Sequence, residues 1–259
     1  MCDTCGCGGE HNGFTIHAPA TEENHSHGHH HDHTHEHDHA HEHSHSETGR
    51  KEIFVETDVL AKNNLLAERN RGWFEAKQIT AVNLVSSPGS GKTTLLEKLI
   101  SALKNTRQIF VIEGDQQTTA DADRIANAGA KALQVNTGNG CHLDAHMINH
   151  AVKDLQITDG ALLFIENVGN LVCPALFDLG EQKRIVIAST TEGEDKPLKY
   201  PTMFQSADIC LLNKTDLLPY LDFSVDLFKE NLNKVNPGIP LLLVSAKTTE
   251  GFEQIIKLF

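Results

Sequence analysis

Between an apolar run and a leucine-rich segment the chain reads Ser86-Ser87-Pro88-Gly89-Ser90-Gly91-Lys92-Thr93, followed by Thr94. The spacing is that of a P-loop, in which Ser86 stands where the first glycine is usual. The apolar run, Ile79–Val85, predicts a buried strand, and the leucines of Thr93–Leu103 fall on one face of a predicted helix. A glycine-rich turn that only joins strand to helix is the alternative, and the Gly91-Lys92-Thr93 ending disfavours it. The segment therefore predicts a phosphate-binding loop.

Each part of this loop has an expected contact with a nucleotide. Backbone N–H groups of the loop, together with the N-terminus of the following helix, should hold the phosphates. Lys92 should reach the β- and γ-phosphates, and Thr93 should ligate Mg²⁺. The expected phosphate-binding set is Pro88, Gly89, Ser90, Gly91, Lys92, Thr93 and Thr94.

Strand and helix patterns alternate on both sides of the loop. Further strands are predicted at Gln108–Ile112, Ala132–Val135, Ala161–Ile165, Arg184–Ala188, Ile209–Leu212 and Leu241–Val244. Further helices are predicted at Glu56–Lys77, Leu143–Leu155, Val225–Val235 and Glu250–Leu258. This alternation predicts an α/β domain with a doubly wound, mainly parallel sheet over residues 53–259.

A second motif indicates which base the nucleotide carries. Asn213-Lys214-Thr215-Asp216 follows an apolar strand late in the chain. The Asp216 carboxylate can accept hydrogen bonds from guanine N1–H and its exocyclic amine, which adenine cannot supply together. A site left with such unpaired acceptors rejects the wrong ligand by about four orders of magnitude. Lys214 is expected to lie along the ring, and Asn213 either braces the loop or contacts N7. The pocket should be closed by Ser245, Ala246 and Lys247. The expected nucleotide is GTP.

Two acidic motifs at strand ends are expected to sense the phosphates. Glu113-Gly114-Asp115 follows the strand after the P-loop helix, which predicts Asp115 near Mg²⁺. Glu166-Asn167-Val168-Gly169 follows the Ala161–Ile165 strand, where the Gly169 N–H could contact a γ-phosphate. Helix capping is the ordinary alternative for an acidic residue at a strand end. The expected catalytic set is Lys92, Asp115, Glu166 and Gly169, and no catalytic base is identified.

Charge and composition restrict the class of protein. The formal net charge is −13, and residues 1–50 hold nine acidic residues against one basic residue. No basic face is available for nucleic acid or for anionic lipid, and no apolar run is long enough to span a membrane. The first residues carry neither a basic nor an apolar signal region, so we expect a cytoplasmic protein. Six cysteines in that compartment indicate metal or redox chemistry rather than disulfides.

Residues 1–52 are expected to form a disordered metal-binding arm. Cys2, Cys5 and Cys7 form a Cys-x-x-Cys-Gly-Cys cluster, and the chain-terminal amine could add a fourth ligand. A planar arrangement of these groups would favour Ni²⁺, and a tetrahedral one would favour Zn²⁺. Twelve of the seventeen histidines lie in the tract 25–45, interleaved with acids and almost free of apolar side chains. Such a tract is expected to bind several ions weakly; an affinity tag is the alternative.

A third metal feature lies inside the predicted domain. Cys141 and His142 sit in a glycine-rich approach to a helix, and Cys173 follows Gly169 by four residues. Buried cysteines are more often packing residues than ligands, but a metal held at Cys173 would feel the nucleotide state. His146 and His150 lie one and two turns further on, as outer contacts or as solvated side chains.

Taken together, these motifs resemble the HypB family of hydrogenase nickel-incorporation proteins, over essentially the whole chain. The most specific part is Glu-Asn-Val-Gly-Asn-Leu-Val-Cys-Pro at 166–174, supported by Gly-Cys-His-Leu-Asp-Ala at 140–145. The resemblance implies a SIMIBI-class GTPase that dimerises with nucleotide and helps deliver nickel to [NiFe]-hydrogenase precursors. It also implies tight nickel binding by Cys2, Cys5 and Cys7, nickel or zinc at Cys141, His142 and Cys173 in the dimer interface, and the small metallochaperone HypA as partner.

Two other interpretations remain open. A urease-type nickel GTPase shares the class, although a Cys-Pro-His motif would be expected there and this chain has Cys173-Pro174-Ala175. A nickel store, in which the GTPase domain is secondary, is favoured by the histidine tract.

Overall fold

The computed structural model describes residues 15–17, 48–115, 120–138 and 140–259. The leader cysteines Cys2, Cys5 and Cys7 and the histidine tract 25–45 lie outside these residues. In α1, side chains are described from Asp58 onward.

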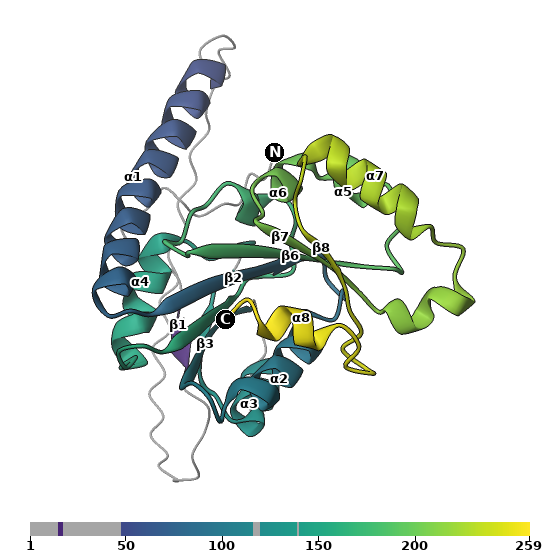
Figure 1. Cartoon of the computed structure of the whole chain (residues 1–259). Helices are drawn as coiled ribbons and strands as arrows, with labels where there is room; N and C mark the ends of the chain where they lie inside the picture. The colour runs from purple at the N-terminus through teal and green to yellow at the C-terminus, as the bar shows by residue number, and fades with distance from the viewer. Residues whose placement is uncertain (1–14, 18–47, 116–119, 139) are drawn as a thin grey trace, which may run out of the picture.

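The described residues form one eight-stranded sheet in the order β1-β4-β3-β5-β2-β6-β7-β8 (Figure 1). Its strands are β1 (Thr15–His17), β2 (Thr80–Ser86), β3 (Ile109–Asp115), β4 (Lys131–Asn136), β5 (Leu162–Glu166), β6 (Lys183–Ser189), β7 (Ile209–Asn213) and β8 (Leu241–Leu243). All neighbouring strands are parallel except the edge pair β1 and β4. The expected doubly wound, mainly parallel sheet is therefore confirmed.

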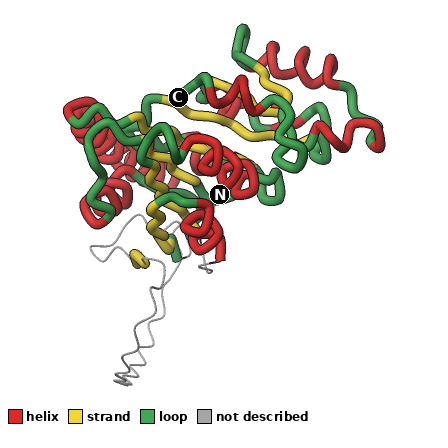
Figure 2. Tube along the Cα trace, turned by 60° about the horizontal axis from the view of Figure 1, so that its bottom comes forward, coloured by secondary structure: helices red, strands yellow, loops and turns green. Residues whose placement is uncertain are grey.

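Helices connect the strands and cover both faces of the sheet, as Figure 2 shows from a second direction. They are α1 (Thr48–Ala76), α2 (Lys92–Leu103), α3 (Ala120–Ala128), α4 (Ala145–Asp154), α5 (Lys196–Lys199), α6 (Pro201–Gln205), α7 (Val225–Val235) and α8 (Phe252–Ile256). Two 3₁₀ turns, η1 (Cys173–Ala175) and η2 (Thr215–Tyr220), lie in the loops after β5 and β7.

The alternating side chains of the buried strands divide the core into two layers. On one face, Leu84, Phe164 and their neighbours pack against α2, α3 and α8. On the other face, the sheet packs against α1 and α4 in one cluster and against α6 and α7 in another. Because both faces are covered, the strands are apolar throughout rather than alternating with polar residues.

Several elements were not indicated by the sequence. The strand Thr15–His17 is too short to carry a pattern and gains its hydrogen bonds from β4. Helix α3 buries only a small face that includes Ala122 and Ile125, so its apolar periodicity is weak. Helix α1 begins at Thr48 rather than at Glu56, and its N-terminal part extends beyond the sheet (Figure 1). Among the described residues, no helix combines the length and the apolar character that a membrane crossing requires.

The strand order places the functional loops together. β2 lies between β5 and β6, so the chain crosses from one side of β2 to the other between those two strands. Ligands of open α/β sheets bind at such a reversal, beyond the carboxyl ends of the strands. The carboxyl ends of β2, β3, β5 and β7 all lie at this edge, because these strands are parallel.

Candidate functional site: a nucleotide pocket beside a cysteine–histidine cluster

The P-loop joins β2 to the N-terminus of α2. Gly91 precedes the helix with φ of 91°, and a Cβ added there would lie 2.7 Å from the Asn213 side-chain nitrogen. Only glycine fits this position without strain, because the left-handed region disfavours side chains and the space is already filled. The P-loop is thus shaped by a contact with Asn213, which lies 122 residues later in the chain, in the Asn213–Asp216 motif.

Two P-loop side chains converge on one buried carboxylate. The Lys92 ammonium lies 2.9 Å from Glu166 Oε1, and the Thr93 hydroxyl donates to the same oxygen at 2.6 Å. Asp121 at the start of α3 adds a weaker contact of 3.4 Å to the Thr93 hydroxyl. Glu166 Oε2 is buried and has no hydrogen-bond partner within the described part of the chain. Hydroxyl and carboxylate oxygens are the donors that Mg²⁺ prefers, so Thr93 and Glu166 fit such an ion.

Glu113 is an acidic residue of this cluster that is not among the site residues predicted from the sequence. It lies directly opposite Glu166 in the β3–β5 register and is 2% exposed. Burial, and then the charges of Glu166, Asp121 and Asp115, raise the pKa of Glu113 from 4.5 to about 8. Its Oε2 also finds no partner among the residues described. A carboxylate within the otherwise apolar run Ile109–Gly114 was the signal that could have identified it.

The remaining parts of the Glu113–Asp115 and Glu166–Gly169 motifs lie close by. Asp115 ends β3, where its backbone carbonyl accepts a hydrogen bond from Thr137. Gly169 packs against the P-loop, since a Cβ there would lie 3.2 Å from the Pro88 Cα. The structure therefore brings Gly169 to the loop that is expected to hold phosphate.

The expected base-binding residues form one connected unit. Asn213 Nδ2 donates to the Ser90 carbonyl at 2.9 Å, and its Oδ1 accepts from the Ala246 N–H at 3.1 Å. Both ends of the amide therefore brace the loops, which was one of the two roles open for this residue. Lys214 is held in the left-handed region at φ 63°, with its ammonium on the Gly89 carbonyl at 2.7 Å.

Asp216 and Ser245 complete this unit from opposite sides. The Ser245 hydroxyl donates to Asp216 Oδ1 at 2.7 Å, which orients the carboxylate. Lys247 follows on the exposed surface of the last loop. The Asn213–Asp216 motif after β7 and the Ser245–Lys247 segment after β8 are thus joined by direct hydrogen bonds.

Cys141, His142 and Cys173 come together, although they lie on two separate loops. Their ligand atoms all lie within 4.8 Å of one another, and the Cys141 sulfur is 3.6 Å from His142 Nδ1. Asn170 ties the loops together by donating to the Cys141 carbonyl at 3.4 Å and accepting from the Val172 N–H at 2.8 Å. Two thiols and an imidazole form a set suited to Ni²⁺ or Zn²⁺.

His142 is the buried member of this triad. It is 7% exposed and stacks on the Phe177 ring with centroids 3.9 Å apart. Burial lowers its pKa, against an opposing effect of Asp144. The ring is therefore neutral at physiological pH, which is the form that binds a metal.

His146 and His150 lie side by side on α4, outside the triad. Their Nε2 atoms are 3.2 Å apart and their ring centroids 4.5 Å apart. Burial, and then His146 and Lys153, lower the pKa of His150. The short contact requires one ring to donate and the other to accept.

The long helix α1 braces the same two loops from behind, a role that its sequence did not suggest. Asn63 accepts from the Ala145 N–H at 2.9 Å and donates to the Asp178 carbonyl at 2.8 Å. Asn70 donates to the Ala145 carbonyl at 2.8 Å and to the Leu179 carbonyl at 3.1 Å. Each asparagine therefore connects the start of α4, after Cys141 and His142, to the segment that follows Cys173.

Comparison with known proteins places the chain in a family. The family described as "CobW/HypB/UreG, nucleotide-binding domain" matches residues 80–242. The hydrogenase maturation factor HypB of Rhizobium leguminosarum bv. viciae is 59% identical over 201 residues, which cover 78% of this chain and 67% of that protein. The chain thus spans about two thirds of the length of such relatives.

Two solved structures are similar over most of their length. HypB from Archaeoglobus fulgidus has a TM-score of 0.71 and 41% identity, covering 76% of this chain and 97% of that one. HypB from Helicobacter pylori in complex with nickel has a TM-score of 0.70 and 41% identity, covering 76% and 93%. The chain belongs to the CobW/HypB/UreG family of nucleotide-binding proteins and, within it, to the HypB hydrogenase maturation factors.

Proposed function

We propose that the chain is a GTP-hydrolysing nickel metallochaperone, which binds nickel and delivers it to a [NiFe]-hydrogenase precursor. The observation that carries this proposal is a shared loop. Glu166 bonds the P-loop side chains Lys92 and Thr93, and Cys173, seven residues later, joins Cys141 and His142. A nucleotide that rearranges the start of this loop acts on a segment that also holds a metal ligand.

GTP with Mg²⁺ is the proposed nucleotide complex. Lys92 would exchange Glu166 for phosphate oxygens, and Thr93, Glu166 and Asp115 would supply oxygens to Mg²⁺. The ion would neutralise charge that develops on the transferred phosphoryl group. The Gly169 N–H, already packed on the P-loop, would contact the γ-phosphate. Asp216, oriented by Ser245, would select guanine.

Nickel is the proposed cargo, and Zn²⁺ is the second ion that the same ligands could hold. Cys141, His142 and Cys173 would form the inner site, with Cys2, Cys5, Cys7 and the histidine tract loading it. The nickel complex of the 41% identical relative from Helicobacter pylori supports nickel as cargo. The proposed partners are a second copy of the chain, HypA and the hydrogenase large-subunit precursor, all in the cytoplasm, with no nucleic acid and no membrane.

Reconstitution with purified components tests the proposal. The purified protein should release phosphate from GTP and transfer nickel to a hydrogenase large-subunit precursor, measured by metal analysis of the separated acceptor. Lys92→Ala should abolish GTP hydrolysis and transfer, whereas Cys173→Ser should hydrolyse GTP but transfer little. Transfer that is unaffected by Lys92→Ala would overturn the proposal.

The same reconstitution separates the two alternatives. A urease apoprotein offered as acceptor should receive little nickel; preferential loading of it would identify a urease-type GTPase. A nickel store would bind the same amount of nickel equally tightly with GDP and with a GTP analogue. Deleting residues 25–45 should lower the number of ions bound in equilibrium dialysis. The tight nickel site expected at Cys2, Cys5 and Cys7 should remain.

A further inference from the structure

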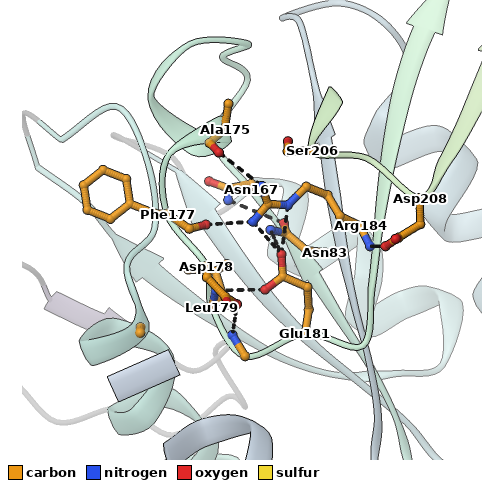
Figure 3. Close-up of polar contacts among 12 residues, drawn as sticks. Asn83, Asn167, Ala175, Phe177, Asp178, Leu179, Glu181, Arg184, Ser206 and Asp208 are labelled. Carbon is orange, nitrogen blue, oxygen red and sulfur yellow. Dashed lines mark hydrogen bonds and ion pairs between the residues drawn. The ribbon is translucent and has the colours of Figure 1, made fainter. Parts of the chain in front are cut away.

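A buried polar network lies on the face of the sheet that also carries the loops of Cys141, His142 and Cys173 (Figure 3). Asn167 Nδ2 donates to Asn83 Oδ1 at 3.4 Å, and Asn83 Nδ2 donates to Glu181 Oε1 at 3.0 Å. The Arg184 guanidinium bonds the same carboxylate at 2.8–2.9 Å. All four side chains are at most 7% exposed. Burial alone would raise the pKa of Glu181, but Arg184 and Asn83 hold it below its ordinary value, so the pair is ionised.

The network is attached to both loops that carry metal ligands. Arg184 donates to the carbonyls of Ala175 and Phe177, at 3.3 and 2.9 Å, in the segment that follows Cys173. Asn167 Oδ1 accepts from the Leu143 N–H at 3.1 Å, and Leu143 directly follows His142. The positions of the two loops therefore depend on one set of hydrogen bonds.

The network also connects to the nucleotide pocket, because Asn167 directly follows Glu166 in the chain. Successive residues at a strand end point to opposite faces of the sheet. Glu166 points to the α2 face, where it bonds Lys92 and Thr93, and Asn167 points to the face of α1 and α4. A nucleotide that engages Lys92 and Thr93 removes both donors from Glu166, and Glu166 is joined to Asn167 by a single peptide bond.

We infer that Asn167 is the positioning residue through which the nucleotide pocket sets the geometry of Cys141, His142 and Cys173. This inference rests on the proposed function and names the side chain that transmits its nucleotide dependence. A shift of Asn167 displaces Leu143 directly and the Ala175–Phe177 carbonyls through Asn83, Glu181 and Arg184. A metal site tolerates changes in ligand distance of only about 0.2 Å, so a small shift changes nickel affinity. Couplings between sites are typically about 5- to 150-fold in affinity.

The test measures nickel affinity with GDP and with a non-hydrolysable GTP analogue. The parent protein is the full chain with Cys2, Cys5 and Cys7 replaced by serine, so that thiolate-to-nickel absorption reports the inner site. Cys210 is fully buried and does not contribute. A chelator buffer sets free Ni²⁺, because the histidine tract also binds the ion. The nickel affinities of the parent with GDP and with the GTP analogue should differ at least fivefold. Asn167→Ala should reduce the ratio of these two affinities below twofold and alter the thiolate-to-nickel absorption band.

Asn70→Ala is the matched control. Asn70 is an equally buried asparagine that braces the same two loops from α1. Its loss should weaken nickel binding in both nucleotide states while the ratio of the two affinities stays at the parent value. If Asn167→Ala does not fold, as judged by circular dichroism, Asn167→Ser takes its place, because its side chain is too short to bond Asn83.

The outcomes separate this inference from the proposed function. An Asn167 variant that keeps the parent ratio overturns the inference, and so does a parent with equal affinities in both states. In the first case GTP hydrolysis and nickel transfer, measured separately as above, still stand. In the second, nickel transfer to the hydrogenase precursor decides between the proposed function and a nickel store. A parent that neither hydrolyses GTP nor binds nickel would overturn both.

Discussion

At the scale of single residues, the acidic cluster under the P-loop is held in an unfavourable state. Glu113 and Glu166 are opposite each other on adjacent strands, both are buried, and each has an oxygen without a partner among the described residues. Burial first, and then the charges of Glu166, Asp121 and Asp115, raise the pKa of Glu113 to about 8. A divalent ion at Thr93 and Glu166 would remove this cost.

The raised pKa of Glu113 predicts a pH dependence of stability without metal or nucleotide. Between its ordinary pKa of 4.5 and about 8, the folded protein binds the proton and the unfolded chain does not. The stabilisation is therefore complete below 4.5 and is lost as pH rises through about 8, with a slope of up to about 1.4 kcal/mol per pH unit. Glu113→Gln should remove this contribution, measured by urea unfolding in EDTA from pH 6 to 9. Glu253→Gln, at an exposed position, serves as control. If the free energy of unfolding varies with pH in the same way for the unaltered protein, Glu113→Gln and Glu253→Gln, Glu113 is not protonated.

Asp216 is the residue that should determine the base. Asp216→Asn replaces an acceptor by a donor facing guanine while keeping an oxygen for the Ser245 hydroxyl. GTP affinity should fall about 10- to 100-fold, since hydrogen bonds to charged groups contribute about 1.5–3 kcal/mol, and xanthine nucleotides should bind better. Competition against a fluorescent GTP analogue, with Asp222→Asn as an exposed control in the same loop, measures the change. Equal binding of ATP and GTP by the unaltered protein would show that Asp216 does not select guanine.

At the scale of elements, α1 acts as a brace for the metal loops rather than as a simple cover for the sheet. Asn63 and Asn70 are seven residues apart, which is about two helical turns, so both face the sheet side of the helix. Their side chains replace apolar contacts by hydrogen bonds to backbone groups of Ala145, Asp178 and Leu179. Arg71 adds a bond to the Glu181 carbonyl at 2.7 Å. The helix thus satisfies backbone groups that the two loops cannot pair themselves.

Removing one of these asparagines should destabilise the fold. Asn63→Ala leaves the Ala145 N–H and the Asp178 carbonyl without partners, at a cost of about 1–3 kcal/mol. The neighbouring Asn64 is exposed, so Asn64→Ala should change stability by less than about 0.5 kcal/mol. Denaturant unfolding at one pH compares the two variants. If Asn63→Ala and Asn64→Ala are equally stable, water replaces the hydrogen bonds of Asn63 without loss of stability.

At the scale of the whole molecule, two exposed apolar side chains lie beside the Cys141, His142 and Cys173 triad. Val172 is 57% exposed and Leu176 is 45% exposed, and they flank the Cys173 turn. Exposed apolar side chains beside these three candidate ligands suit the proposed nucleotide-dependent homodimer. The triad offers three ligands, so a second copy of the chain could complete the coordination of a shared ion.

A charge on this surface should prevent the proposed dimer. Val172→Asp should keep the GTP analogue complex monomeric in multi-angle light scattering, because an unpaired buried carboxylate is costly at an interface. Leu198→Asp, at an exposed leucine on α5, should dimerise normally. A Val172→Asp protein that still dimerises with nickel and GTP analogue would place the interface elsewhere.

The sequence by itself determined the fold class, and it predicted the P-loop, the Asn213–Asp216 motif and the set Cys141, His142 and Cys173. These are short segments with their own spacing, strand periodicity or turn chemistry, and each can be recognised without its neighbours. Their order along the chain, strand before loop before helix, was enough to predict a doubly wound parallel sheet, and all seven predicted strands are present.

Only the tertiary structure decided which distant residues share a site. Glu113 meets Glu166 through strand pairing, and Asn63 and Asn70 become braces because α1 packs against backbone groups that lie 75 or more residues later. The contacts of Asn167 with Leu143 and Asn83 depend on three separate elements. Polar residues of this kind carry no local pattern, because their roles come from long-range hydrogen bonds, and burial of unpaired groups is what makes those bonds necessary.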